Sequence, residues 1–183
     1  DGVDQDLPDL EQIVVLRCGG TAPAGTVTLD EFVATGTDVD PAVVNALVGS
    51  LTGDDLSDLL FTSGTTGAPK GVRLTHAQTL RAFGDWADIG GLRPEDRYLC
   101  VNPFFHAFGY KAGIVAAFMA GATLVPMATF DLDAVADLIE SERISVIPGP
   151  PTIYQSLLNH PGFDAERAST LRLAVTGAAA VPV

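Results

Sequence analysis

Helix and strand alternate most clearly in residues 131–158, DLDAVADLIESERISVIPGPPTIYQSLL. Asp131 is a helix N-cap, and apolar residues recur after it every three or four positions, which predicts an amphipathic helix. These apolar residues are Leu132, Val135, Leu138 and Ile139. The run Ile144–Ile147 then predicts a buried strand, and Thr152–Leu158 predicts the next helix. Such helix–strand–helix units are the building blocks of parallel sheets.

The same alternation continues on both sides of this unit. Short runs of β-branched and aromatic residues predict strands, and capped amphipathic runs predict helices. The further expected strands are Ile13–Leu16, Leu56–Phe61, Tyr98–Val101, Thr123–Val125 and Leu171–Val175; the further expected helices are Pro41–Val48, Thr75–Ala87 and Lys111–Ala120, with a loop at Gly19–Thr28. Together they predict an α/β fold: a mostly parallel sheet with helices on both faces, which binds ligands at the carboxyl edge of its strands.

The chain has two parts by this interpretation. Residues 1–55 form a lead-in strand and a variable linker segment, and residues 56–183 form a phosphate-loop and parallel α/β subdomain. The sequence has no initiating Met and stops shortly after an expected buried strand. We therefore expect the chain to be part of a longer protein.

Composition indicates a folded globular protein and disfavours several partners. Hydrophobic residues make up 47% of the chain and charged residues 18%. A net charge of −13, with scattered basic residues, disfavours binding to nucleic acid or an anionic membrane. No apolar run reaches the roughly 18 to 20 residues that span a bilayer. We expect Cys18 and Cys100 to be free thiols rather than a disulfide and, with no secretory signal apparent, predict a cytoplasmic protein.

The strongest functional signal is the stretch TSGTTGAPKG at residues 62–71. Its glycines let successive backbone amides converge on an anion, its hydroxyls add donors, and its lysine adds a positive charge. The predicted phosphate-binding residues are Thr62, Ser63, Gly64, Thr65, Thr66, Gly67 and Lys70. Pro69 precedes the lysine and residues 72–75 alternate like a strand, so this is a strand-to-strand loop, unlike a Walker A loop. The alternative is a flexible turn that binds nothing.

This stretch resembles the phosphate loop of the adenylate-forming superfamily, which includes acyl-CoA synthetases, aryl-CoA ligases, luciferases and peptide-synthetase adenylation domains. The match covers the whole motif, and further landmarks follow in the family's order from Ser57 to Val183. The resemblance implies ATP, Mg²⁺ and CoA as substrates or cofactors. It also implies a small-molecule carboxylic acid, converted first to an acyl-adenylate and then to acyl-CoA.

Residues 102–109, NPFFHAFG, are similar to the family segment that lines the acyl pocket. The resemblance implies that Phe105, His106 and Gly109 belong to this pocket, with His106 near the substrate carboxylate or closing the acyl tunnel. From chemistry alone, a single histidine beside aromatic residues is more often a packed core residue. No acidic residue lies between Asn102 and Thr129 to pair with a substrate ammonium group, which favours a plain carboxylic acid over an amino acid.

A third landmark follows the last expected strand. Gly177, Ala178, Ala179 and Ala180 resemble the family segment against the adenine ring. Small residues leave room for a flat ring and let backbone carbonyls approach its amine. The family often has proline at the fourth position, so Ala180 is a departure, and a tight turn is the alternative explanation for four small residues.

The resemblance predicts a fatty-acid or other carboxylic acid:CoA ligase of lipid metabolism, most similar to bacterial enzymes, some of which act on acids from steroid breakdown. It places the Mg²⁺-binding Glu, the ribose-binding Asp and the C-terminal catalytic lysine beyond Val183. We therefore assign no catalytic residue and no metal ligand here, and expect the chain to be inactive alone. A non-catalytic nucleotide-binding module and a luciferase-like oxygenase are the alternatives; the acid and the oligomeric state stay open.

Overall fold

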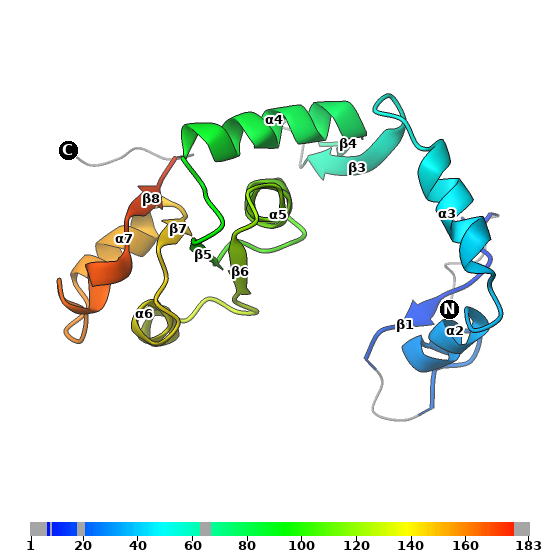
Figure 1. The fold of residues 1–183 in the computed structure, drawn as a ribbon. Helices are drawn as coiled ribbons and strands as arrows, with labels where there is room; N and C mark the ends of the chain where they lie inside the picture. The colour runs from blue at the N-terminus through cyan, green and yellow to red at the C-terminus, as the bar shows by residue number, and fades with distance from the viewer. Residues whose placement is uncertain (1–6, 8, 18–20, 63–66, 178–183) are drawn as a thin grey trace. The chain divides into compact units, whose positions relative to one another are not determined.

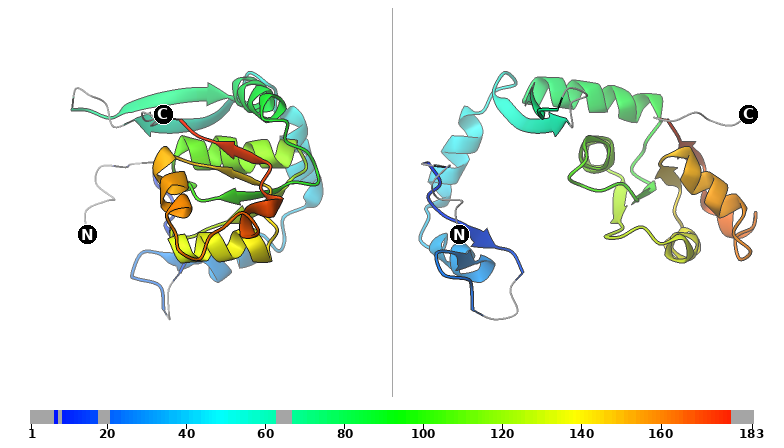
Figure 2. Two further views of the ribbon diagram at one scale, coloured as in Figure 1. Left: turned by 90° about the vertical axis from the view of Figure 1, so that its left-hand side faces the viewer. Right: turned by 180° about the vertical axis from the view of Figure 1, so that it is seen from behind.

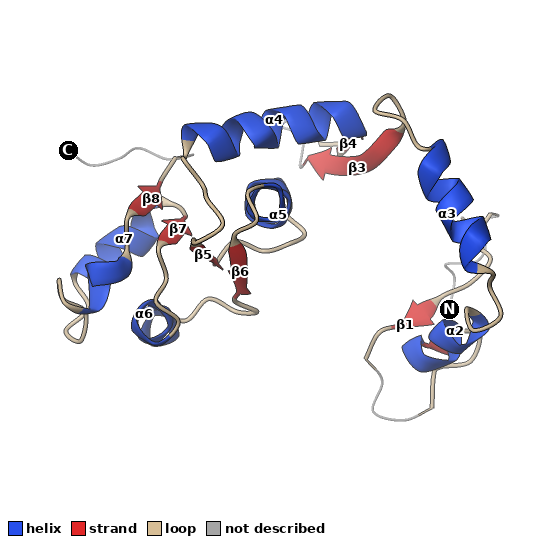
Figure 3. Cartoon of the chain, viewed as in Figure 1, coloured by secondary structure: helices blue, strands red, loops and turns tan. Residues whose placement is uncertain are grey.

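The computed structural model describes residues 7, 9–17, 21–62 and 67–177. Contacts divide the chain into two compact units, residues 1–51 and 52–183, which are described separately. Helices and strands alternate along the chain from residue 70 onward, whereas they occur in pairs before it (Figures 1 and 3). Within the described ranges, no helix is both long enough and apolar enough to cross a membrane.

The described residues of the first unit form two short strands and two helices. A capping box begins its first helix: the Thr28 hydroxyl accepts from the amide of Glu31, whose carboxylate accepts from the amide of Thr28. The second helix has Asp40 as N-cap and Pro41 at its first position, as predicted. The loop predicted through Thr28 is wrong at its end, where a strand leads into a helix that the capping-box sequence could have revealed. The elements are β1 (Val14–Val15), β2 (Val27–Thr28), α2 (Leu29–Thr35) and α3 (Pro41–Ser50).

The second unit joins an antiparallel hairpin to a parallel sheet. β3 and β4 form the hairpin, and the sheet has the strand order β6-β5-β7-β8 with every pairing parallel. The predicted α/β class with a mostly parallel sheet is therefore confirmed. The elements are β3 (Leu56–Thr62), β4 (Lys70–Thr75), α4 (His76–Ile89), β5 (Arg97–Cys100), η1 (Phe108–Val115), α5 (Ala116–Met119), β6 (Thr123–Pro126), α6 (Leu132–Ser141), β7 (Val146–Pro148), α7 (Pro151–Leu158), η2 (Arg167–Thr170) and β8 (Leu173–Val175).

Helices cover both faces of the sheet because the central strand β5 is apolar on both sides (Figure 2). Tyr98 and Cys100 pack into one core with Ala117 of α5. Leu99, which points to the opposite face, packs into a second core with residues of α6 and α7, among them Ile139. Successive side chains of a strand alternate between faces, so a strand buried on both sides reads as a continuous apolar run.

A buried carboxylate ties the strands together at the amino end of the sheet. Asp96 is 1% exposed and accepts hydrogen bonds from Arg172 Nε at 2.7 Å, from Ser145 Oγ at 2.7 Å and from the amide of Arg93 at 3.0 Å. Burial acts to raise the pKa of Asp96, but the bonds from Arg172 and Ser145 outweigh it and hold this pKa below its usual range. The segments before β5, β7 and β8 are therefore joined through one side chain.

Two element boundaries differ from prediction. β7 begins at Val146 rather than Ile144, because the amide of Ile144 donates to Ile139 O and so closes α6 instead of pairing in the sheet. The helix predicted from Lys111 begins earlier, at Phe108, and its first eight residues are a π-helix. Rare π-helical turns are often found beside functional sites.

Candidate functional site

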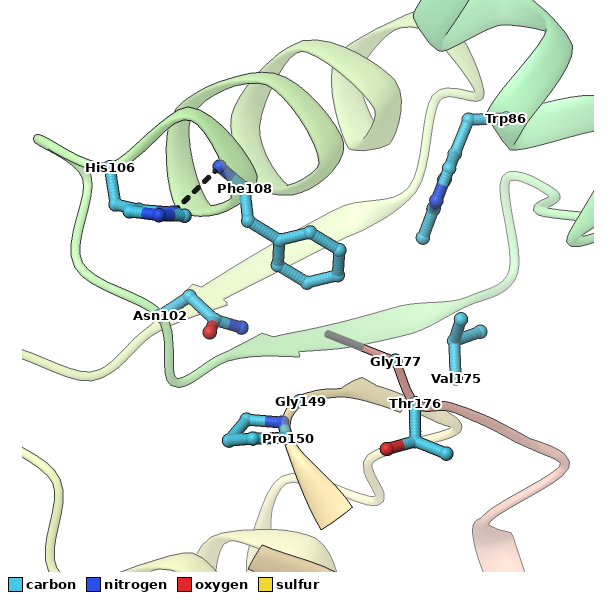
Figure 4. Close-up of a pocket in the computed structure, with 9 residues that line it drawn as sticks. All are labelled: Trp86, Asn102, His106, Phe108, Gly149, Pro150, Val175, Thr176 and Gly177. Atoms are coloured by element: carbon cyan, nitrogen blue, oxygen red, sulfur yellow. Dashed lines mark hydrogen bonds between the residues drawn. The ribbon is translucent and has the colours of Figure 1, made fainter. Parts of the chain in front are cut away.

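Three strands end beside one cavity of about 480 Å³ (Figure 4). β5 leads to Asn102 and His106, and β7 leads to Gly149 and Pro150. β8 ends at Val175 and is followed by Thr176 and Gly177, which complete this edge. In an open α/β sheet this is the edge where ligands bind, so the position of the site follows from the parallel topology.

Two aromatic side chains form the wall opposite the strand ends. Trp86 of α4 and Phe108 of η1 line the cavity with ring centroids 6.3 Å apart and planes at 87°. Trp86 also lies 6.3 Å from the ring of Tyr98, which anchors it to the core. The sequence analysis does not single out Trp86, because nothing in its spacing distinguishes a helix residue that faces a cavity from one that faces a neighbouring helix.

His106 lies at the rim of the cavity, on the segment between β5 and η1. Its Nδ1 accepts a hydrogen bond of 3.1 Å from the amide of Phe108 (Figure 4). A ring nitrogen that accepts cannot carry the proton, so the neutral ring carries it on Nε2. His106 therefore has one N–H donor left for a ligand, which suits a carboxylate oxygen.

Side chains also hold the carboxyl ends of the strands in place. Asn102 Nδ2 donates to Pro148 O at 3.2 Å and links β5 to β7. The Tyr154 hydroxyl bonds to Ile147 O at 2.6 Å and Val175 O at 2.8 Å, which links β7 to β8. Burial raises the pKa of Tyr154 to about 12, although backbone hydrogen bonds act to lower it. Tyr154 therefore keeps its proton at neutral pH, and its hydroxyl holds the ends of β7 and β8 together.

The other two residues predicted in the acyl pocket lie outside the cavity lining. Phe105 is 89% exposed. Gly109 is buried, and a Cβ there would lie 2.3 Å from Pro103 O and 2.6 Å from Asn102 O. Only glycine can pack this closely, so Gly109 fixes the course of the segment that carries His106.

The thiol of Cys100 faces the same buried helix. Its Sγ lies 3.8 Å from Gly109 O, and a Cβ at Gly113 would approach it to 2.7 Å. Burial raises the pKa of Cys100, which suits a packing role rather than a nucleophile. Cys100 is a free thiol, as expected, whereas Cys18 falls outside the described residues.

The predicted phosphate loop closes the β3–β4 hairpin. Thr62 pairs with Lys70, and its hydroxyl lies 3.5 Å from Lys70 O. Gly67 has φ +99°, a left-handed conformation that glycine adopts without strain. The loop therefore connects strand to strand, as predicted. The positions Ser63, Gly64, Thr65 and Thr66 fall outside the described residues.

The third predicted segment also begins at the cavity. Gly177 lies among its lining residues, so the expected adenine segment and His106 border one space. Ala178, Ala179 and Ala180 fall outside the described residues. Among the described lining residues none is acidic. In the same part of the chain, no three His, Cys, Asp or Glu side chains are grouped to hold a metal ion.

Comparison with known proteins identifies the family of this chain. The family described as AMP-binding enzyme matches residues 3–183. A 3-[(3aS,4S,7aS)-7a-methyl-1,5-dioxo-octahydro-1H-inden-4-yl]propanoyl:CoA ligase of Mycobacterium tuberculosis is 56% identical over 177 residues, which cover 97% of this chain and 34% of the relative. This chain thus spans about a third of that relative's length.

Two solved structures share the fold at lower identity. The anthranilate CoA ligase AuaEII in complex with anthranoyl-AMP has a TM-score of 0.75 and 26% identity, over 98% of this chain and 34% of that chain. ATP-bound MatB from Rhodopseudomonas palustris has a TM-score of 0.67 and 29% identity, over 86% of this chain and 31% of that chain. By family match, sequence and fold, the chain belongs to the AMP-binding enzymes, the adenylate-forming superfamily that the stretch at residues 62–71 resembles.

Proposed function

We propose that the enzyme containing this chain is an ATP-dependent carboxylic acid:CoA ligase. The observation that carries the proposal is the complete motif at residues 62–71, with described ends on a strand-to-strand hairpin. A strand-to-strand phosphate loop separates this enzyme from Walker-type NTPases, whose loop opens a helix. The cavity beside His106 supplies a second compartment in the same unit, of a size that suits a small organic acid.

The proposed reaction has two steps. A carboxylate oxygen attacks the α-phosphorus of ATP, the bond to the β-phosphate oxygen breaks, and acyl-adenylate and pyrophosphate form. The CoA thiol then loses its proton and attacks the acyl carbon, and AMP leaves. Catalysis of the first step relies on positioning and on neutralising phosphate charge. Bound Mg²⁺ would neutralise part of that charge; the described residues hold no group of three His, Cys, Asp or Glu side chains around one point.

The residues of this chain would divide the positioning work. Backbone amides and hydroxyls of residues 62–67, with Lys70, would hold the phosphates. The Nε2–H of His106 would donate to the carboxylate and orient its second oxygen toward the α-phosphorus. Gly177 borders the cavity from the side expected to receive the nucleotide. The strand ends braced by Asn102 and Tyr154 would keep these groups from drifting apart.

We propose further that the acid carries a compact alicyclic ring rather than an amino group or a long chain. A substrate ammonium group would lack a partner here, because no acidic side chain lines the described cavity. The flat ring faces of Trp86 and Phe108 suit a rigid apolar ring system. The name of the Mycobacterium tuberculosis relative specifies a propanoyl group on a fused, saturated two-ring system. Such an acid is the first substrate to test.

The test is exchange of labelled pyrophosphate into ATP by the full-length enzyme, followed by detection of the CoA thioester. The panel contains a fused-ring propanoate, a medium-chain fatty acid, an aryl acid and an amino acid. We expect the ring propanoate to support exchange best and the amino acid to support none. Thioester formation separates a ligase from a nucleotide-binding module and from an oxygenase. Exchange driven by amino acids alone would contradict the acid assignment.

Lys70→Ala provides the matched test of the phosphate loop. Loss of a charge-assisted contact should lower exchange roughly 10- to 150-fold. Arg73→Ala is the control, because this exposed side chain lies on the same strand outside the motif and carries the same charge. Equal effects of both substitutions would show that Lys70 acts only through general charge.

A further inference from the structure

Lys111 is a buried cation that the proposed reaction does not use. It lies in η1 with only 1% of its surface exposed. Its Nζ lies 2.5 Å from Asp58 Oδ2 and 2.8 Å from Thr79 Oγ1, and 4.7 Å from the centroid of the Tyr110 ring. One ammonium group therefore joins three elements, η1, β3 and α4.

The ion pair is not needed for stability as such. Removing two charges from water costs several kcal/mol each, and apolar side chains of similar volume often serve equally well. Burial acts to raise the pKa of Asp58, but the hydrogen bond from Lys111, with smaller contributions from Ser57 and His76, outweighs it and lowers this pKa. Asp58 Oδ1 is buried without a hydrogen-bond partner among the described residues. The carboxylate thus depends on Lys111, which fixes where β3 can lie.

The two partners belong to the two functional segments of the unit. Asp58 precedes Thr62, where the phosphate loop begins, along the same strand, and a register shift in the hairpin falls between Leu56 and Asp58. Lys111 follows His106 by little more than one helical turn, in the helix that begins with the cavity residue Phe108. A displacement of either segment would stretch a short bond between buried charges.

We propose that Lys111, Asp58 and Thr79 are positioning residues that hold the phosphate-loop hairpin in register with the acid-binding cavity. The expected effect on the KM for ATP rests on the proposed function. The expected effect on the position of β3 rests on the contacts alone. The directional ion pair specifies one arrangement of β3 against η1, whereas an apolar contact would allow the two to slide. The link couples the position of ATP to that of the acid without touching either substrate.

The experiment compares Lys111→Met with the double variant Lys111→Met/Asp58→Leu in the full-length enzyme. The single variant leaves a buried, unpaired carboxylate and should unfold at lower temperature. The double variant removes both charges and should recover most of the thermal midpoint. Hydrogen exchange of the amides at residues 56–75 should nevertheless be roughly 10-fold faster than in the wild type, and the KM for ATP should rise by a similar factor with a smaller change in kcat.

Two matched variants separate positioning from stability. Thr79→Ser keeps the hydroxyl and should retain wild-type exchange in the hairpin. Asp96→Asn weakens a buried ion pair at the amino end of the sheet, so it should lower the thermal midpoint without raising the KM for ATP. A double variant with wild-type hairpin exchange and wild-type KM would overturn the proposal. If the wild type fails to exchange pyrophosphate, the proposed function falls, and hydrogen exchange of the hairpin alone decides the positioning role.

Discussion

The amino and carboxyl ends of the parallel sheet are built from different chemistry. At the amino end, Asp96 is 1% exposed and accepts hydrogen bonds from Arg172, Ser145 and Arg93. At the carboxyl end, a cavity of about 480 Å³ is lined by glycine, proline and aromatic residues, with no acidic side chain among the described ones. Fixed charge joins the strands at one end, and the other end has an open cavity, where we propose that the acid binds.

Asp96→Ala is expected to have the largest effect, and on stability alone. It removes the three hydrogen bonds that the Asp96 carboxylate accepts, and a hydrogen bond to a charged group typically contributes about 1.5–3 kcal/mol. Thermal or denaturant unfolding of the full-length enzyme measures the loss, and pyrophosphate exchange measures the KM values, which should not change. A normal unfolding midpoint would show that Asp96 does not stabilise the amino end of the sheet. A raised KM for the acid would show that this end also affects the cavity.

The pH dependence of stability tests whether the charge of Asp96 stabilises the amino end of the sheet. Because the folded pKa of Asp96 is lowered, its ionised form stabilises the fold fully above the ordinary Asp value of about 3.9. This stabilisation is lost as the pH falls through the lower folded pKa. The stability difference between the wild type and Asp96→Asn should therefore narrow as the pH drops below about 4. A difference that stays constant down to lower pH would show that charge is not the cause.

Gly109→Ala tests the close packing at the carboxyl end. Its Cβ would meet the backbone carbonyls of Pro103 and Asn102, which cannot turn aside as a flexible side chain would. Overpacking typically costs about 1–3 kcal/mol. The displaced segment carries His106, so kcat should fall together with the unfolding midpoint. Gly49→Ala is the control, because the same added methyl group would meet nothing within 4 Å.

Trp86→Phe is expected to have the smallest effect, and on substrate choice alone. The variant keeps an aromatic ring against Tyr98 but withdraws part of the wall that faces Phe108. An aromatic pair contributes about 0.5–1.5 kcal/mol, so the KM for a ring-bearing acid should rise roughly 2- to 10-fold. The KM for ATP should stay the same. An equal rise for ATP would place Trp86 beside the nucleotide instead.

The sequence by itself determined the local elements and the chemistry of the motif. Caps at Thr75 and Asp131 begin α4 and α6 as predicted, because capping depends on neighbours within three residues. The apolar run at β5 predicted a strand buried on both faces, and β5 is the centre of both cores. The hydroxyls, glycines and lysine of residues 62–71 lie within a few positions of one another, so the hypothesis that they bind phosphate needs no tertiary structure.

Tertiary structure alone decided which distant side chains meet. Trp86 and Gly177 border one cavity, and Lys111 reaches Asp58 across 53 positions of sequence. Neither contact can be predicted from sequence periodicity. A single buried lysine or a tryptophan on a helix face has the same local sequence pattern whatever it packs against. Burial changes the free energy of a charge by several kcal/mol, yet burial is a property of the assembled sheet and helices. The sequence therefore predicts which groups bind phosphate and carboxylate, and the folded structure shows which distant side chains hold the strands and the hairpin in place.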